Sequence, residues 1–207
     1  MKLILCRHGQ TEWNKIHKFQ GLTDIPLNET GLEQAEKVSE LLLNEKFSEI
    51  YSSKLIRAIK TAEIINENHS VPMHKLSELN ELNFGVFEGK SMEEVIAEFG
   101  ESIYERVYHK YDFMHLKGQS YVEKDINEIL PLLKKLISRH LNESIAVVAH
   151  EGVNRLIISN LIGLNPRKQN IMQSNDCVYF LEGNELGKFE IEMQCINKKR
   201  IKGFREY

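Results

Sequence analysis

Two short apolar runs in this chain stop abruptly at charged residues, and this pattern limits the folds it can adopt. Leu3–Cys6 ends at Arg7 and His8, and Ile145–Ala149 ends at His150. A continuous apolar run of this length is typical of a parallel strand that is covered on both faces. Amphipathic helical patterns separate such runs, so we predict an α/β layered fold with a mostly parallel sheet. Ligands of these folds bind at the carboxyl ends of the strands.

The other periodic patterns predict further elements of the same fold. Helices are expected over residues 28–46, 54–66, from 91 onward, 122–141 and from 150 to about 162. Further strands are expected at 49–51, 71–76 and, two or three of them, within 176–204. Thr30 and Glu33 have the spacing of a capping box, and Ser52 or Ser53 is placed to cap the second helix. Pro131 is expected to kink or split the long helix.

Charge balance and segment lengths exclude several classes of protein. The chain has 207 residues, which suits a single domain over 1–207, and its 27 Lys and Arg against 30 Asp and Glu give no broad basic surface for nucleic acid. No apolar stretch reaches the roughly 20 residues of a membrane helix. Cys6, Cys177 and Cys195 are scattered, so we expect reduced thiols in a cytoplasmic protein, and we leave a homodimer open.

Three predicted strand ends carry residues that suit a phosphate. The first ends in Arg7 and His8, the second is followed by Arg57 one helical turn later, and the third ends in His150. Two imidazoles, two guanidiniums and two helix N-termini at one rim favour a tetrahedral dianion. Taken singly, such residues are more often structural, but a cluster of them at strand ends is costly without a ligand. Metal-ligand spacings and Gly-rich nucleotide loops are absent from the sequence, so we predict no metal and no cofactor.

The sequence around these residues resembles the histidine phosphatase superfamily, also called the phosphoglycerate mutase-like family. The matching segments are Arg7-His8-Gly9-Gln10-Thr11-Glu12-Trp13-Asn14, Gln20-Gly21-Leu22-Thr23-Asp24-Ile25-Pro26-Leu27, Tyr51-Ser52-Ser53-Lys54-Leu55-Ile56-Arg57-Ala58, Leu79-Asn80-Glu81-Leu82-Asn83-Phe84-Gly85 and Val148-Ala149-His150-Glu151-Gly152-Val153-Asn154-Arg155. Together they extend from residue 3 to about 163 and are specific in combination. The resemblance implies a three-layer sandwich with a helical cap inserted at about 91–120.

The resemblance also implies roles for individual residues. His8 would be the nucleophile that forms a phosphohistidine, and Gly9 would leave room for the phosphate. The phosphate-binding residues would be Arg7, Asn14, Arg57 and His150. Glu81 would be the general acid and base, which requires a raised pKa. Gln20, Gly21 and Glu151 are expected to bind substrate, and Glu88 is given a supporting role at most.

Two regions depart from the usual family pattern. Glu151 follows the second histidine, where relatives often have Gly or Asn. A carboxylate there would disfavour a strongly anionic substrate, but we favour a residue stabilised by the helix dipole. The expected cap carries aromatic and sulfur side chains, namely Tyr104, Tyr108, His109, Tyr111, Phe113, Met114 and His115. They would either form an aromatic wall over the substrate or pack the cap, and we favour packing.

These features lead to a prediction of function. We expect a metal-independent phosphatase that hydrolyses a small phosphomonoester, such as a sugar phosphate, a phosphoglycerate, a phosphoamino acid or α-ribazole phosphate, through phospho-His8. One alternative is a cofactor-dependent phosphoglycerate mutase, which would return the phosphoryl group to its substrate. The other is a non-catalytic phosphate-binding module, which would have no need to keep His8 and Glu81.

Overall fold

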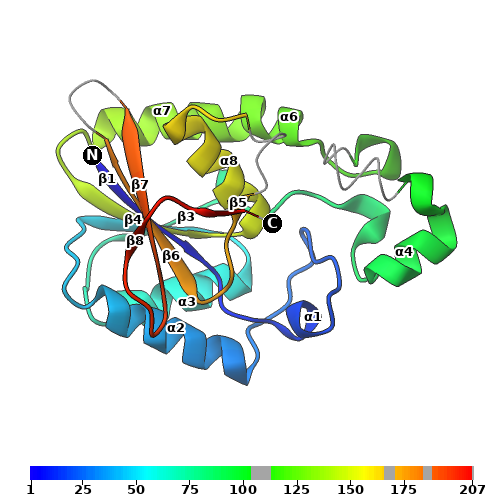
Figure 1. Cartoon of the computed structure of the whole chain (residues 1–207), viewed down its shortest axis with the longest axis horizontal. Coiled ribbons are helices and arrows are strands. Elements are labelled where there is room, and N and C mark those ends of the chain that lie inside the picture. Colours follow the sequence, from blue (N-terminus) through cyan, green and yellow to red (C-terminus); the bar gives the residue numbers. More distant parts are fainter. Residues whose placement is uncertain (104–112, 166–170, 184–187, 207) are drawn as a thin grey trace.

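The computed structural model describes residues 1–103, 113–165, 171–183 and 188–206, and it confirms the predicted α/β fold (Figure 1). Its sheet has the order β3-β2-β4-β1-β6-β7-β8. The strands are β1 (Lys2–Arg7), β2 (Glu49–Ser53), β3 (Met73–Leu76), β4 (Ser144–Ala149), β6 (Cys177–Gly183), β7 (Phe189–Cys195) and β8 (Ile201–Lys202). Strands β3, β2, β4 and β1 run parallel, and β6, β7 and β8 extend the sheet antiparallel. A separate pair is formed by β5 (Ile171–Met172) and β9 (Arg205–Glu206).

Helices on both faces explain why the strands are continuously apolar. Leu3 and Leu5 of β1 belong to one buried core, and Ile4 and Cys6 belong to another on the opposite face. The helices are α7 (Leu130–Arg139) and α8 (Glu151–Ile162) on the first face, and α2 (Glu29–Leu42) and α3 (Ile56–Asn66) on the second. Figure 1 shows the resulting three layers, as expected.

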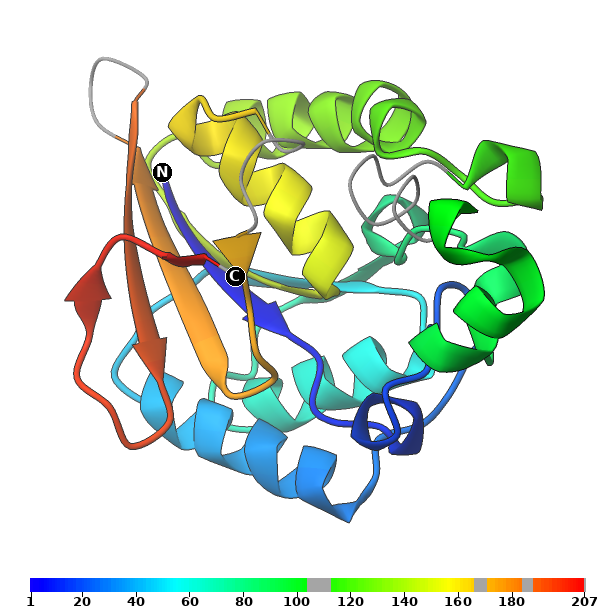
Figure 2. The same cartoon turned by 45° about the vertical axis from the view of Figure 1, so that its right-hand side comes forward.

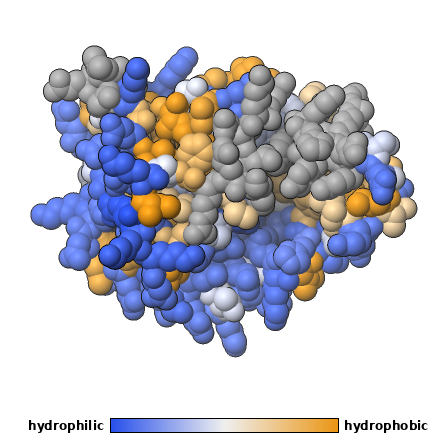
Figure 3. Space-filling model, in the orientation of Figure 1, coloured by the Kyte–Doolittle hydropathy of each residue, from blue (hydrophilic) through white to orange (hydrophobic). Residues whose placement is uncertain are grey.

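Helix α2 is shorter than predicted and begins with a different cap. Asn28 precedes it, and its side-chain oxygen accepts a hydrogen bond from the backbone N–H of Gly31 at 2.8 Å. The predicted capping box of Thr30 and Glu33 is therefore wrong, because both residues already lie inside the helix. The outer side of α2 is polar, and hydrophilic residues cover the lower part of the molecule in the view of Figure 3.

Helix α3 takes its cap from a distant loop. The backbone N–H of Ile56 donates to Asp24 Oδ1 at 2.7 Å, and no side-chain cap comes from the residue before the helix. The predicted cap by Ser52 or Ser53 is wrong, since the Ser53 hydroxyl lies against His150 instead. Asp24 thus ties residues 20–27 to the start of α3, which carries Arg57.

The long helix predicted over 122–141 is divided near Pro131. Helix α6 (Tyr121–Lys124) leads into a π-helical turn over Asp125–Ile129, which continues into α7. Pro131 is the second residue of α7 and has no N–H to donate to the preceding turn, which accounts for the wider turn before it. None of the helices that the structure describes has the length and apolar character to span a membrane.

The expected cap region contributes a small apolar core of its own. Helix α4 (Met92–Phe99) begins with a capping box of Ser91 and Glu94. Val95 of this helix packs with Phe87 and Phe113 in a cluster separate from the two cores of the sheet. Figure 2 shows α4 on the side of the molecule toward which the parallel strands point.

The expectation of three reduced cysteines is wrong for two of them. Cys177 and Cys195 form a disulfide between β6 and β7, while Cys6 is free and buried. The two residues stand directly opposite each other in the antiparallel ladder, with their Cα atoms 4.0 Å apart. A separation of 18 residues in sequence did not reveal this pairing, because it depends on the register of the two strands.

Candidate active site

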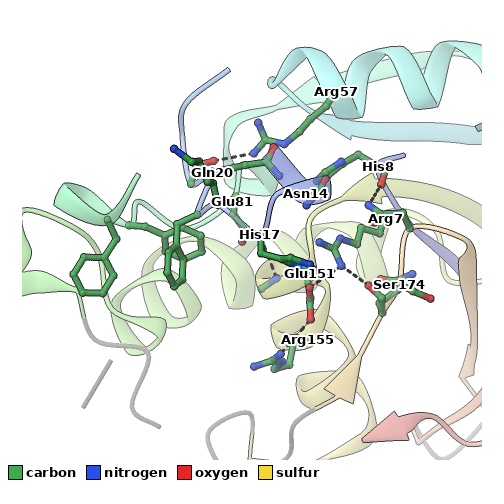
Figure 4. Close-up of a pocket in the computed structure, with 18 of the residues that line it drawn as sticks. Arg7, His8, Asn14, His17, Gln20, Arg57, Glu81, Glu151, Arg155 and Ser174 are labelled. Carbon is green, nitrogen blue, oxygen red and sulfur yellow. Dashed lines mark hydrogen bonds and ion pairs between the residues drawn. The ribbon is translucent and has the colours of Figure 1, made fainter. Parts of the chain in front are cut away.

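The carboxyl ends of β1, β2 and β4 meet at a pocket of about 590 Å³ that is lined by Arg7, His8, Asn14 and Arg57 (Figure 4), and His150 is buried next to His8. Arg7 ends β1 and His8 follows it, Arg57 lies in the first turn of α3 after β2, and His150 is the residue between β4 and α8. The rings of His8 and His150 are 5.0 Å apart between their centroids. The sequence prediction that these four residues come together is therefore confirmed as geometry.

The tautomer of His8 is set by the backbone. Its Nδ1 lies 2.7 Å from the carbonyl oxygen of Gly9, which can only accept, so Nδ1 carries the proton and Nε2 keeps its lone pair. The backbone N–H of His8 donates to Ala149, and its carbonyl accepts from Asn175 Nδ2. Burial, followed by the charges of Arg57 and Arg7, holds the pKa of His8 well below its ordinary value. The imidazole is thus held neutral and fixed, as a nucleophile requires.

His150 is held by Ser53. Its Nε2 lies 2.7 Å from the Ser53 hydroxyl. The hydroxyl oxygen accepts a hydrogen bond from the backbone N–H of Leu55, and the hydroxyl hydrogen is donated to Nε2. Nδ1 of His150 is then the protonated atom, and it is buried without a partner among the described residues. Burial and the nearby charge of Arg57 lower the pKa of His150. The ring is therefore a neutral donor aimed at a group yet to bind.

The two guanidiniums are anchored by carbonyl oxygens. Arg57 donates to Thr23 at 2.9 Å and to Gly21 at 2.8 Å, and Arg7 donates to Gln173 at 2.7 Å. Burial lowers the pKa of Arg57 to about 10, so it stays charged at neutral pH. The Nε atoms of Arg7 and Arg57 are both buried without a partner in the described part of the chain. Such orphan donors are what a bound phosphate oxygen would satisfy.

Glu81 lines the same pocket and is only 8% exposed. Its oxygens accept from the backbone N–H groups of Leu82 at 3.0 Å and Gly152 at 3.3 Å. Burial raises the pKa of Glu81, although both hydrogen bonds and the arginines lower it. A side chain at Gly152 would come within 2.6 Å of the Glu81 carboxyl, so this glycine is required by close packing.

The remaining predicted residues take different positions around the pocket. Gln20 lines it and has a buried side-chain oxygen with no partner among the described residues. Gly21 lines the pocket as well, and its carbonyl accepts a hydrogen bond from Arg57. Asn14, in α1 (Glu12–Lys15), uses Oδ1 to cap that helix, which leaves its amide Nδ2 to donate to a ligand. Glu88 accepts from the backbone of residues 22, 23 and 84, a supporting position as expected.

Glu151 has more contacts than the favoured helix-dipole interpretation predicts. It is the first residue of α8, as the helix-dipole interpretation requires, but its carboxylate also points to the pocket. Oε2 lies 2.6 Å from Nη1 of Arg7, and Oε1 lies 3.6 Å from Nη2 of Arg155. Figure 4 shows Glu151 between the two arginines. The carboxylate is therefore part of the site's charge arrangement.

Several residues of the site gave no usable signal in the sequence. Gln173 and Asn175 lie between β5 and β6, where no periodicity marks them, yet they hold Arg7 and the His8 carbonyl. Arg155 was visible only as part of the quoted motif, and its spacing of four from Glu151 on a helix is the signal that places the two together. Ser53 belonged to the expected strand end, but its contact with His150 depends on strand order.

The aromatic residues of the expected cap divide into two groups. Tyr104, Tyr108, His109 and Tyr111 lie outside the described residues. Phe113 lines the pocket but is almost completely buried, and its ring packs on Phe84 at 4.8 Å and Phe87 at 5.7 Å between centroids. For Phe113, packing is the better supported of the two interpretations. Among the described residues, the one group with the spacing of metal ligands is Asp176 with the two disulfide cysteines.

Substitution of Gly9 by alanine is expected to destabilise the fold by about 1–3 kcal/mol, because it overpacks a backbone contact. An added Cβ would lie 2.2 Å from the carbonyl oxygen of Gly31, so the close approach that Gly9 permits is to α2 rather than to phosphate. Thermal unfolding measures the effect. Gly183→Ala is a control with a small expected effect, since its Cβ would meet only the Phe189 side chain. Equal melting temperatures for wild type and Gly9→Ala would contradict this argument.

Comparisons with known proteins agree with this geometry. The family model described as histidine phosphatase superfamily (branch 1) matches residues 3–195. The chain is 31% identical to the uncharacterized phosphatase PhoE of Bacillus subtilis (strain 168), over 98% of this chain and 97% of that protein. It is 32% identical to phosphoserine phosphatase 1 of Hydrogenobacter thermophilus, over 81% of this chain and 79% of that protein. Phosphoglycerate mutases are also among its relatives.

The fold comparison leads to the same family. The crystal structure of a putative α-ribazole-5′-P phosphatase from Escherichia coli K-12 superposes with a TM-score of 0.80 at 26% identity, over 96% of this chain and 97% of that one. The prediction of a phosphoric monoester hydrolase is confirmed at the level of the family and its phosphatase relatives. This chain belongs to the histidine phosphatase superfamily, branch 1.

Proposed function

We propose that this chain hydrolyses small phosphomonoesters by way of a phosphohistidine on Nε2 of His8. The observation that carries the proposal is the contact between His8 Nδ1 and the Gly9 carbonyl, which leaves Nε2 unprotonated in a pocket with Arg7 and Arg57. In the first step the bond from Nε2 to phosphorus forms while the ester P–O bond breaks. Arg7, Arg57, His150 and Asn14 bind the non-bridging oxygens and stabilise their charge.

Glu81 serves both half-reactions. Burial raises its pKa and so favours the acid form, which donates its proton to the leaving alcohol oxygen. The resulting carboxylate then takes a proton from the water that attacks phosphorus. The N–P bond breaks, inorganic phosphate leaves, and both His8 and Glu81 return to their starting protonation states. Gln20 and Glu151 line the same pocket, which supports a role for both in binding the substrate.

The substrate is a small phosphorylated metabolite. Relatives carry names that refer to phosphoserine and to α-ribazole phosphate, so membership of the family does not choose between an amino acid ester and a sugar ester. Candidates include sugar phosphates, phosphoglycerates and α-ribazole phosphate. A pocket of about 590 Å³ is within the usual range for metabolite-sized ligands.

Phosphate release from a panel of these esters is expected to continue undiminished in EDTA, because Arg7 and Arg57 provide the positive charge that the transition state needs. The measurement is inorganic phosphate formed with and without the chelator. Inhibition by EDTA that a divalent ion reverses would contradict the metal-independent mechanism. Conversion of 3-phosphoglycerate to its isomer without phosphate release would favour a mutase, and binding of phosphate without any turnover would favour a non-catalytic module.

The location and the assembly of the protein stay predictions. A cytoplasmic protein was expected from scattered cysteines, but the Cys177–Cys195 disulfide removes that support, since disulfides are rare in reducing compartments. Cell fractionation and the mass of the protein in solution test the cytoplasmic location and the homodimer, respectively.

A further inference from the structure

Glu151 places a negative charge against the residue that must bind phosphate. Its Oε2 is 2.6 Å from Nη1 of Arg7, and its side chain is 20% exposed toward the pocket. Arg155, whose side chain is only 3% exposed, approaches the other oxygen at 3.6 Å. The Nε of Arg155 donates to the Ile171 carbonyl at 3.2 Å, so this guanidinium is fixed in place. An anchored cation and a carboxylate thus stand side by side next to the phosphate-binding residues (Figure 4).

The charges change when a phosphate ester enters. A phosphate dianion is balanced by Arg7 and Arg57, and it shares the guanidinium of Arg7 with Glu151, which contacts Nη1. Glu151 then lies beside a dianion across the same guanidinium, and like charges at such short range repel in a partly buried site. For an ester without a positive charge, Glu151 therefore weakens binding. A substrate that brings its own cation to Glu151 removes this repulsion.

We propose that Glu151 selects phosphomonoesters whose alcohol carries an ammonium group close to the ester oxygen, an inference that rests on the proposed function above. The ammonium must be close, because Glu151 contacts the same guanidinium that would hold the phosphate oxygens. Arg155 lies beside Glu151, so its guanidinium would bind a carboxylate attached to the carbon that carries the ammonium group. The substrate class is thus an O-phosphorylated amino alcohol, and an O-phosphoamino acid uses both members of the pair.

A purely structural role for Glu151 gives a different expectation. A carboxylate at the first position of a helix is stabilised by the helix dipole whatever ester is bound. In that case substitution of Glu151 would change stability, or the rate for every ester by the same factor. Selection by charge changes the ratio between esters, and this ratio is what the test measures.

The first test needs only the wild-type protein and four matched esters. O-Phosphoserine carries ammonium and carboxylate, phosphoethanolamine carries ammonium alone, 3-phosphooxypropanoate carries carboxylate alone, and ethyl phosphate carries neither. We expect kcat/KM to be at least about tenfold higher for each ammonium ester than for its partner without ammonium, as is typical of a charge-assisted hydrogen bond. The ratio of O-phosphoserine to phosphoethanolamine distinguishes an amino acid from a simple amino alcohol. Equal values within both pairs would overturn the proposal.

The second test is Glu151→Gln, which keeps the size of the side chain and removes its charge. We expect kcat/KM to fall about ten- to a hundredfold on the two ammonium esters, mainly through KM, and to rise on ethyl phosphate because the negative charge that repels the phosphate is removed. Glu151→Asp keeps the charge and should retain the preference for ammonium. A uniform change on all four esters would overturn the proposal.

Failure of this inference can be told from failure of the proposed function. p-Nitrophenyl phosphate has a good leaving group and no ammonium, so it reports the phosphohistidine chemistry without the selection. Turnover of this ester with no preference for ammonium would remove the role of Glu151 alone. Absence of turnover on it and on all four matched esters would remove the proposed function as well.

Discussion

Replacement of His8 by alanine is expected to reduce kcat by about 100,000-fold or more, since removal of an enzyme nucleophile costs losses of this order. His150 is not placed to take over its role, because its ring lies 5.0 Å away between centroids and its Nε2 contacts the Ser53 hydroxyl. Arg7 and Arg57 remain anchored by backbone carbonyls, so the variant should still bind inorganic phosphate. The measurements are steady-state turnover and phosphate binding by calorimetry.

Labelling stopped with alkaline detergent, which preserves phosphohistidine, completes the test of His8. Wild type mixed with a ³²P-labelled ester should yield an acid-labile, alkali-stable phosphohistidine, and His8→Ala should yield none. His69→Ala is the matched control, because His69 stacks on Phe47 beyond the end of α3 and should leave turnover intact. A labelled protein from His8→Ala, or turnover near that of wild type, would refute phospho-His8 as the intermediate.

The layered fold could be predicted because each layer leaves its own pattern in the sequence. Leu3–Cys6 and Ile145–Ala149 are apolar throughout since helices cover both faces, and α2 shows a single apolar stripe since it covers one. The ends of elements were less predictable. Asn28 and Asp24 both cap helices, but the second does so across 32 residues of sequence, which no local pattern contains.

The positions of His8, Arg57 and His150 in the active site could be predicted, because each residue comes after a predicted strand and belongs to a family motif. Contacts made by the backbone of a remote loop could not, and the Gln173 carbonyl that orients Arg7 is an example. The ion pair between the side chains of Glu151 and Arg7 could not be predicted either. Helix position alone favoured a dipole interaction, whereas the side-chain direction is set by the proximity of β1 and α8 in the folded chain.

Replacement of Glu81 by glutamine is expected to lower kcat/KM about 100- to 10,000-fold for alkyl phosphates, the usual contribution of a general acid. The loss on p-nitrophenyl phosphate should be far smaller, because its leaving group departs without a proton. kcat on this ester should still fall, since phosphohistidine hydrolysis loses its base, and labelled phospho-His8 should accumulate. The p-nitrophenyl ester also serves as the control for any shift of the Leu82 and Gly152 contacts that the amide causes.

The pH dependence of kcat/KM tests whether Glu81 acts in its protonated form. Burial raises the pKa of Glu81, so its acid form persists above the usual range, and burial lowers the pKa of His8, so its neutral form persists below the usual range. Wild-type kcat/KM on an alkyl ester should therefore fall on the alkaline side as Glu81 loses its proton and on the acid side as His8 gains one. In Glu81→Gln the alkaline fall should disappear and the acid fall should remain. Equal losses on both classes of ester, with an unchanged alkaline fall, would show that another group is the acid.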